Sequence, residues 1–156
     1  MELVVETFVA APPGRVFAVA TDITRWPEVV TAIRSVEVLT PGPVAVGTRF
    51  RETRTMFGRE ESEEMEIAEL SPPGRFVLTA ESHGTRYQAE HTFAPDGAGT
   101  RLRLVFEGSP MTLVARLMTP MGWLMAGAIR KQLAADLDDL KRAAELSPLP
   151  SGRGTG

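Results

Sequence analysis

Alternating apolar and polar residues run through the first two thirds of the chain, a pattern typical of strands with one buried face. A first strand is predicted over residues 2–10, where β-branched and aromatic residues dominate. Six further strands, most of them ending at Pro or Gly, are predicted over residues 36–40, 48–57, 59–70, 75–83, 85–94 and 100–108. Because consecutive strands with short connections pair as an antiparallel meander, we expect a single sheet.

Two short helices are predicted between the first two strands. The first begins near Pro12 or Pro13, since proline suits the first helical turn. The second follows Asp22, a predicted N-cap, and Pro27 keeps it short or broken. Their apolar faces carry Val16, Phe17 and Ala20 in the first helix and Trp26, Val29, Val30 and Ile33 in the second.

From residue 111 to residue 146 the apolar period becomes helical. Pro120 either kinks this helix or separates a short helix from a long one. The helix is the only element long enough to cover the sheet, so the predicted fold is α+β, with a curved antiparallel sheet of about seven strands wrapped around a long C-terminal helix. Residues 1–146 then form a single domain, and the Pro/Gly/Ser-rich residues 147–156 are predicted to be a disordered tail.

Several short motifs occur in an order and at a spacing that resemble a known superfamily. They are Ala11-Pro12-Pro13 before Val16-Phe17, Asp22 before Trp26-Pro27, Gly47 before a long strand, and Gly99-Thr100-Arg101 before the last strand. Together they resemble the START-like, helix-grip superfamily (SRPBCC), in particular its polyketide cyclase/dehydrase members, over residues 2 to about 145. The resemblance implies the fold and leaves the function open, because such proteins carry lipids, bind hormones, cyclise polyketides or assist other proteins.

The parity of the strands assigns one face of the sheet to the helix and predicts a cavity there. Across that inner face we expect the rows Phe50, Ile67, Leu78, His91, Leu104, then Glu52, Met65, Ala80, Ala89, Phe106, and then Arg54, Glu63, Ser82, Tyr87, Gly108. This register also places Arg51 near Glu66 on the outer face. Mostly apolar walls with a few convergent polar groups are typical of a ligand pocket.

The polar residues of this face have two interpretations each. Arg54 and Glu63 form either an ion pair at the open end of the sheet or a contact for a ligand's carboxylate or carbonyl. Glu52, beside apolar neighbours, is expected to have a raised pKa and is a candidate general acid or base. His91 is either a satisfied core residue or a proton-transfer group.

Larger apolar side chains are similarly open to two interpretations. Trp26 either caps the mouth of the cavity or anchors the short helices to the sheet. Met118, Met121 and Met125 form either plain core or an adaptable lid over the ligand.

Composition narrows the function classes. The chain has 156 residues with 17 Lys+Arg against 20 Asp+Glu, a formal net charge of -3, so no basic footprint for nucleic acid is indicated. It has no cysteine, which excludes disulfides, thiolate metal sites and Cys nucleophiles. We expect no metal, no cofactor and no transmembrane helix, a cytoplasmic location, and a monomer or homodimer.

Three functions therefore remain open. The first is binding of a small hydrophobic, lipid- or polyketide-like molecule between the sheet and the C-terminal helix. The second is a polyketide cyclase/dehydratase-type enzyme with Glu52, Arg54, Tyr87 or His91 as candidate catalytic residues. The third is an interaction protein whose apolar segment 117–129 is exposed to a partner or a membrane surface.

Overall fold

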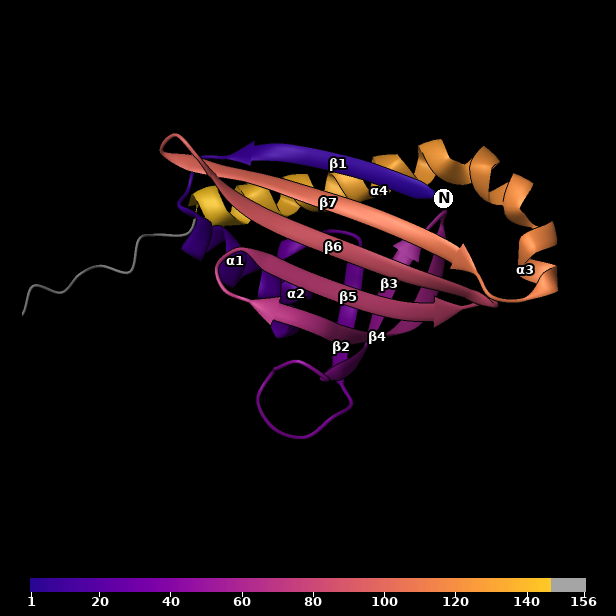
Figure 1. Cartoon of the computed structure of the whole chain (residues 1–156). Helices are drawn as coiled ribbons and strands as arrows, with labels where there is room; N and C mark the ends of the chain where they lie inside the picture. The colour runs from indigo at the N-terminus through magenta and orange to yellow at the C-terminus, as the bar shows by residue number, and fades with distance from the viewer. Residues whose placement is uncertain (147–156) are drawn as a thin grey trace, which may run out of the picture.

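A seven-stranded antiparallel sheet organises the protein, in a computed structural model that describes residues 1–146 (Figure 1). Its strands follow the spatial order β1-β7-β6-β5-β4-β3-β2. They are β1 (Glu2–Val9), β2 (Ile33–Val38), β3 (Arg49–Met56), β4 (Arg59–Ser71), β5 (Arg75–Ser82), β6 (Thr85–Asp96) and β7 (Gly99–Pro110). The predicted meander is confirmed, and β1 closes onto β7 at one edge of the sheet.

The short helices follow β1, as predicted. They are α1 (Pro13–Thr21), the 3-10 helix η1 (Ile23–Arg25) and α2 (Trp26–Val29). Two details differ from the prediction. Ile33 begins β2 instead of ending the second helix, and the side chain of Asp22 makes no capping hydrogen bond and instead accepts one from the Thr24 hydroxyl at 3.2 Å.

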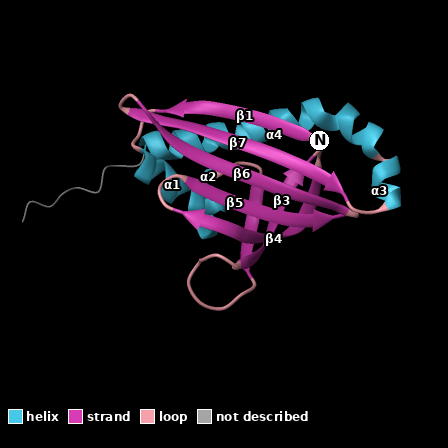
Figure 2. Ribbon diagram, viewed as in Figure 1, coloured by secondary structure: helices cyan, strands magenta, loops and turns pink. Residues whose placement is uncertain are grey.

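The C-terminal helix is divided where Pro120 indicated a break. A short helix α3 (Leu113–Leu117) ends at Met118, and α4 (Thr119–Leu146) follows with proline in its first turn. The hydroxyl of Thr112 caps α3 by accepting the amide hydrogen of Ala115 at 3.1 Å. Figure 2 shows α1, α2 and α4 behind the sheet, whereas α3 and the first turns of α4 extend beyond its end.

Within residues 1–146, no helix is both long and apolar enough to cross a membrane. The tail that the sequence predicts to be disordered, residues 147–156, lies outside the described part of the chain.

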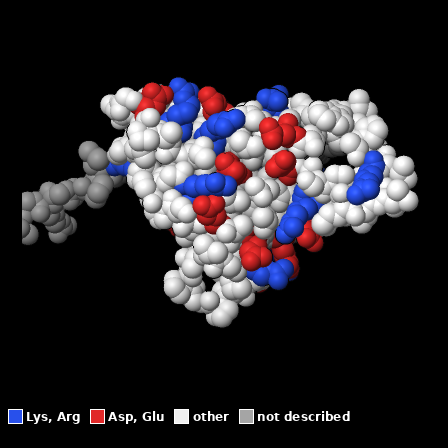
Figure 3. All heavy atoms as spheres, viewed as in Figure 1, with Lys and Arg blue, Asp and Glu red and all other residues white. Residues whose placement is uncertain are grey.

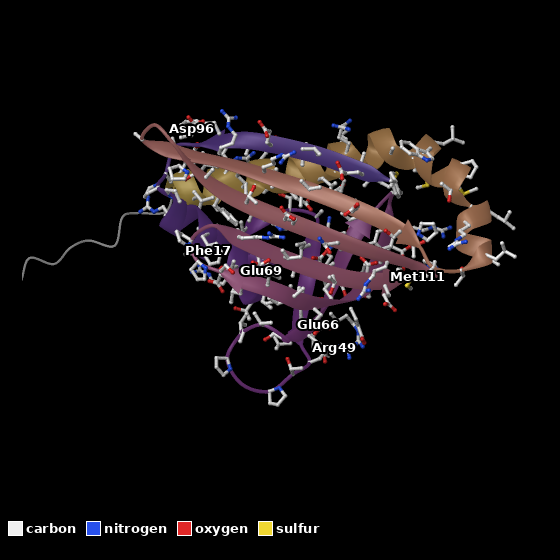
Figure 4. The ribbon with its side chains drawn as sticks, viewed as in Figure 1. Phe17, Arg49, Glu66, Glu69, Asp96 and Met111 are labelled. Carbon is white, nitrogen blue, oxygen red and sulfur yellow. The ribbon has the colours of Figure 1, made fainter. Side chains whose placement is uncertain are left out.

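The core lies at one end of the sheet, under α1, α2 and the C-terminal half of α4. Phe17 of α1, labelled in Figure 4, meets Phe93 edge-on at 5.3 Å between ring centroids. From α4, the residues Leu137, Leu140 and Ala144 are buried in the same cluster. Met111, labelled at the other end of the sheet, lies where β7 leads into α3 and is exposed (Figure 4). The helices therefore cover the α1 end of the inner face and leave the α3 end less covered.

The pairing register differs by two residues from the prediction in two hairpins. Phe50 lies opposite Met65 instead of Ile67, and Leu78 lies opposite Ala89 instead of His91. The reason is that both hairpins close through two-residue turns, Phe57-Gly58 and His83-Gly84, in which both residues have positive φ. A shift of two preserves parity, so the residues of the three predicted rows keep their predicted face, although an irregularity between Ile67 and Glu69 changes the parity at the end of β4.

Candidate functional site

The inner face of the sheet changes from buried to accessible along the strands. Of three adjacent rows that cross the middle of this face, the one nearest α1 contains Phe76, Leu104 and Val5, all buried, together with His91. The row nearest α3 runs from buried Phe50 through Met65, Ala80 and Tyr87 to Gly108. Of these, Met65, Ala80 and Tyr87 are partly exposed.

Between these two rows lies a central row in which Ile67, Leu78 and Leu3 are buried, while Ala89 and Phe106 are partly exposed. Phe106 stacks on Tyr87 with 5.5 Å between ring centroids. Since Phe106, Tyr87 and Met65 all point to the inner face, their partial exposure means that the helices do not fully cover this part of the face. The apolar wall predicted from the sequence is thus present and accessible at the α3 end.

A charged cluster joins the inner face to α4. The Arg54 guanidinium donates from Nε to Glu52 Oε1 and from Nη1 to Asp136 Oδ2, the latter at 2.9 Å. The Gln132 amide donates to the other oxygen of Asp136 at 3.3 Å. Glu52 is only 3% exposed, so this arginine links a buried strand residue to the helix.

The predicted pairing of Arg54 with Glu63 is wrong. Arg54 lies opposite Glu61 in the register, and its ion-pair partners are Glu52 and Asp136. Likewise, Arg51 pairs with Glu64 at 2.9 Å and with Glu37, not with Glu66. The shifted hairpin register explains both errors. Asp136 was missed because the helical period identifies only apolar positions such as the neighbouring Leu137, and it gives no signal for a polar residue beside them.

Burial dominates the protonation of this cluster. The pKa of Glu52 is raised because desolvation outweighs the attraction of Arg54. The pKa of Asp136 is raised for the same reason. For Arg54, burial alone would lower the pKa, but the neighbouring Glu52 and Asp136 carboxylates raise it, so the guanidinium stays charged. One cation thus faces two carboxyl groups.

Glu63 adds a third carboxyl group to this end of the inner face. It lies opposite Glu52 in the β3–β4 register and is partly exposed. Its pKa is raised by burial and then by the charge of Glu52, while Arg54 and His83 act in the opposite direction. The polar end of the inner face is therefore rich in carboxyl groups, and its guanidinium is already bonded.

His91 belongs to the apolar part of the face. Its ring lies 5.4 Å from that of Phe76, and its Nδ1 atom is buried without a hydrogen-bond partner among the described residues. Burial lowers the pKa of His91 to about 4, against weaker contributions from the backbone of Phe76 and Ala89. The imidazole is neutral near neutral pH.

The other predicted site residues divide between core and surface. Trp26 is buried, packs edge-on against Phe50 at 5.6 Å and donates its indole N–H to the Ala20 carbonyl. It therefore anchors the short helices and does not cap an opening. Met118, Met121 and Met125 are 49%, 53% and 38% exposed, so they are not plain core.

A surface groove opens beside the charged cluster. This surface groove, of about 410 Å³, lies between α4, the start of β2 and the end of β3. Thr31, Arg34, Thr55, Gln132, Asp136 and Asp139 are among its lining residues. The Asp136 carboxylate therefore lines the groove and also accepts a hydrogen bond from Arg54. Among residues 1–146, no group of three or more His, Asp or Glu is arranged to hold a metal ion.

Comparisons with known proteins agree with this architecture. A family model described as polyketide cyclase / dehydrase and lipid transport matches residues 1–145. No functionally curated protein matches the sequence.

Among solved structures, the chain is similar to the Zhui aromatase/cyclase of a Streptomyces species (TM-score 0.76, 18% identity, covering 97% of this chain and 98% of that one). It is also similar to the Thermus thermophilus protein TTHA0849 (TM-score 0.72, 22% identity, 92% and 97%). A third similar structure is the di-domain aromatase/cyclase BexL (TM-score 0.76, 18% identity, 95% and 51%). At these identities the likeness establishes the helix-grip fold.

Proposed function

The chain belongs to the family described as polyketide cyclase / dehydrase and lipid transport, and from this membership we propose that it binds a small, largely apolar molecule on the inner face of its sheet. The observation that carries the proposal is the partial exposure of Met65, Tyr87 and Phe106 on that face. Large apolar side chains that point towards a covering helix are normally buried against it. An apolar ligand in this space would remove their surfaces from water.

The chemistry of the charged cluster favours a particular kind of ligand. Arg54 is held by Glu52 and Asp136, and Glu63 stands nearby with a raised pKa. An incoming carboxylate would meet three carboxyl groups and no unbonded guanidinium, so like charges disfavour it. A hydroxyl or phenol group can instead donate to Glu63 or exchange a hydrogen bond with Tyr87. We therefore propose a neutral, hydroxylated apolar ligand, such as a phenolic polycyclic compound.

Filling the space beneath the helix is expected to weaken binding. Ala89→Leu adds a branched side chain to the centre of the inner face and should lower the affinity for a hydroxylated anthraquinone at least roughly tenfold, because the ligand and the new side chain overlap. Binding is measured by titration while following tryptophan emission. A fatty acid of similar size is titrated in parallel and should bind more weakly.

Gln88→Leu is the matched control, because Gln88 adjoins Ala89 on the same strand, faces outward and is exposed. This variant should bind as the parent protein does. Equal affinity of the Ala89→Leu and Gln88→Leu proteins, with both folded by circular dichroism, would place the ligand elsewhere. Tighter binding of the fatty acid would contradict the proposed ligand chemistry.

A second candidate function is catalysis of the aldol closure or dehydration of a bound polyketide-like chain. Its support is the likeness to two aromatase/cyclases together with Glu52, a buried carboxyl group with a raised pKa. A protonated Glu52 would donate to a substrate oxygen, and Tyr87 would act as a second hydrogen-bond donor. Arg54 would then hold Glu52 in place.

If this enzyme function is correct, Glu52→Gln is expected to lower the rate of cyclisation of a linear poly-β-ketone substrate by roughly a hundredfold or more. The amide keeps a hydrogen bond to Arg54 as an acceptor but cannot transfer a proton. Glu60→Gln on the exposed hairpin is the control. Unchanged turnover in Glu52→Gln and in Tyr87→Phe would rule out these roles while leaving ligand binding intact.

A further inference from the structure

The outer side of the α3 end carries a cluster of strongly exposed apolar side chains. Leu124 is 87% exposed, Leu113 is 73% and Trp123 is 60%. With Val114 and Leu117, which are also exposed, these residues are called here the apolar patch. They come from α3 and the first turns of α4, the part of the chain that extends beyond the sheet (Figure 1).

The apolar patch is not an uncovered part of the protein's own core. On α4, the positions that continue the buried Leu137 and Leu140 towards the N-terminus are Leu133, Ala126 and Gly122, all partly buried. Leu124 lies instead in line with Lys131 and Asp138 on the outward side of the helix, both exposed. A helix that simply moved down onto the sheet would leave Leu124 in water.

The charge around the apolar patch differs from that of the rest of the protein. Residues 108–135 contain no Asp or Glu, while Arg116, Arg130 and Lys131 are all exposed. Arg130 is fixed beside β1 by donating from Nη1 to the Val4 carbonyl at 3.0 Å. The nearest acidic residues along the chain are Glu107 and Asp136, although the formal net charge of the whole chain is -3. In Figure 3 this end is mostly white and blue, and red atoms gather over the strands.

We propose that the apolar patch docks on the surface of an anionic lipid bilayer, with Leu117, Trp123 and Leu124 inserted at the interface and Arg116 and Lys131 close to anionic headgroups. Exposed apolar side chains flanked by cations, without acidic residues between them, are suited to such an interface. A second copy of the chain is a poorer occupant, because two-fold pairing of the patch would bring like-charged Arg116, Arg130 and Lys131 together. The inference does not depend on the proposed ligand.

The experiment is flotation of the full chain with two kinds of vesicle, pure phosphatidylcholine and phosphatidylcholine with a third of phosphatidylglycerol. Binding to the anionic vesicles is expected, with a blue shift of tryptophan emission that Trp123→Phe abolishes. Trp26 gives no such shift because it is buried. Leu117→Asp with Leu124→Asp should weaken partitioning roughly tenfold or more for each leucine removed from the interface.

Leu146→Asp is the matched control, since Leu146 is 75% exposed at the opposite end of α4. This variant should bind the anionic vesicles as the parent protein does. Arg116→Gln and Lys131→Gln should each lower partitioning into the anionic vesicles roughly fivefold. Raising the salt concentration should act in the same direction.

Two results would overturn the proposal. Equal partitioning into both kinds of vesicle would show that Arg116 and Lys131 do not bind anionic headgroups. Absence of binding to the anionic vesicles, with a dimer by light scattering that Leu124→Asp dissociates, would instead assign the apolar patch to a second copy of this chain.

Discussion

Arg54→Leu is expected to lower the free energy of unfolding by about 3–5 kcal/mol near neutral pH, because it leaves the buried carboxyl group of Glu52 and the partly buried one of Asp136 without their cation. Glu52 is 3% exposed and Asp136 is bonded to Arg54 across the gap between sheet and helix. The measurement is urea unfolding of the variant and the parent protein. Arg51→Leu is the matched control, since Arg51 lies on the same strand but pairs with Glu37 and Glu64 at exposed positions. Arg51→Leu should lower the free energy of unfolding by no more than about 1 kcal/mol.

The difference in free energy of unfolding between Arg54→Leu and the parent protein should become smaller as the pH falls. The pKa values of Glu52 and Asp136 are already raised in the folded protein, and removing Arg54 raises them further. A folded-state pKa above the unfolded one means that the folded state binds the proton more tightly. Stability is therefore greatest below the ordinary carboxyl value and is lost as the pH rises through the folded value.

Near pH 4.5, the ordinary Glu value, the variant and the parent protein should consequently differ less than at neutral pH. Adding Glu52→Gln to the variant should restore part of the lost stability, because it removes one buried charge. If Arg54→Leu lost no more unfolding free energy than Arg51→Leu, or if its loss did not change with pH, the result would contradict a buried ion cluster.

His91→Leu is expected to remove a loss of stability that the parent protein suffers between pH 6.5 and about 4. The folded-state pKa of His91 is lowered to about 4 from 6.5 because its ring is buried, so the unfolded chain gains the proton first. The stability linked to this histidine is complete above pH 6.5 and disappears as the pH falls to about 4. At 1.36 kcal/mol for each pH unit, the loss is about 3 kcal/mol.

The test compares the pH dependence of unfolding in the parent protein and in His91→Leu, because the carboxyl groups with raised pKa contribute a slope of opposite sign to both proteins. The difference between the two curves should widen in favour of the variant as the pH falls. His83→Asn is the control, since His83 is exposed in a turn where φ is positive. Parallel curves for the parent protein and His91→Leu would show that the imidazole is not held neutral by burial.

His91 and Arg54 lie in two different environments on the inner face of the sheet. His91 lies among Phe76, Leu104 and Val5 at the α1 end, where the helices are packed closely on the sheet. Arg54 lies at the α3 end, where Tyr87 and Phe106 remain partly exposed. The apolar core is therefore concentrated at one end and the accessible surface at the other. A ligand at the open end need not displace the packing that holds the fold.

The sequence alone determined the order and type of the elements and the face of each residue in the predicted rows. Strand alternation has a period of two, so Phe50, Glu52 and Arg54 had to share a face whatever their partners were. Proline also indicated where the C-terminal helix is divided, because it cannot continue the hydrogen-bond ladder of the preceding turn.

The tertiary structure decided what the pattern left open. The register depended on positive φ at Phe57 and His83, a backbone conformation that is uncommon for any residue other than glycine. The pairing of Arg54 with Asp136 joins residues 82 positions apart, and no local period encodes such a contact. The exposure of Met121 and Met125 depended on where the first turns of α4 lie relative to the end of the sheet. An amphipathic stripe records which side of a helix is apolar, but its distance from the facing element is set by the packing of the whole domain.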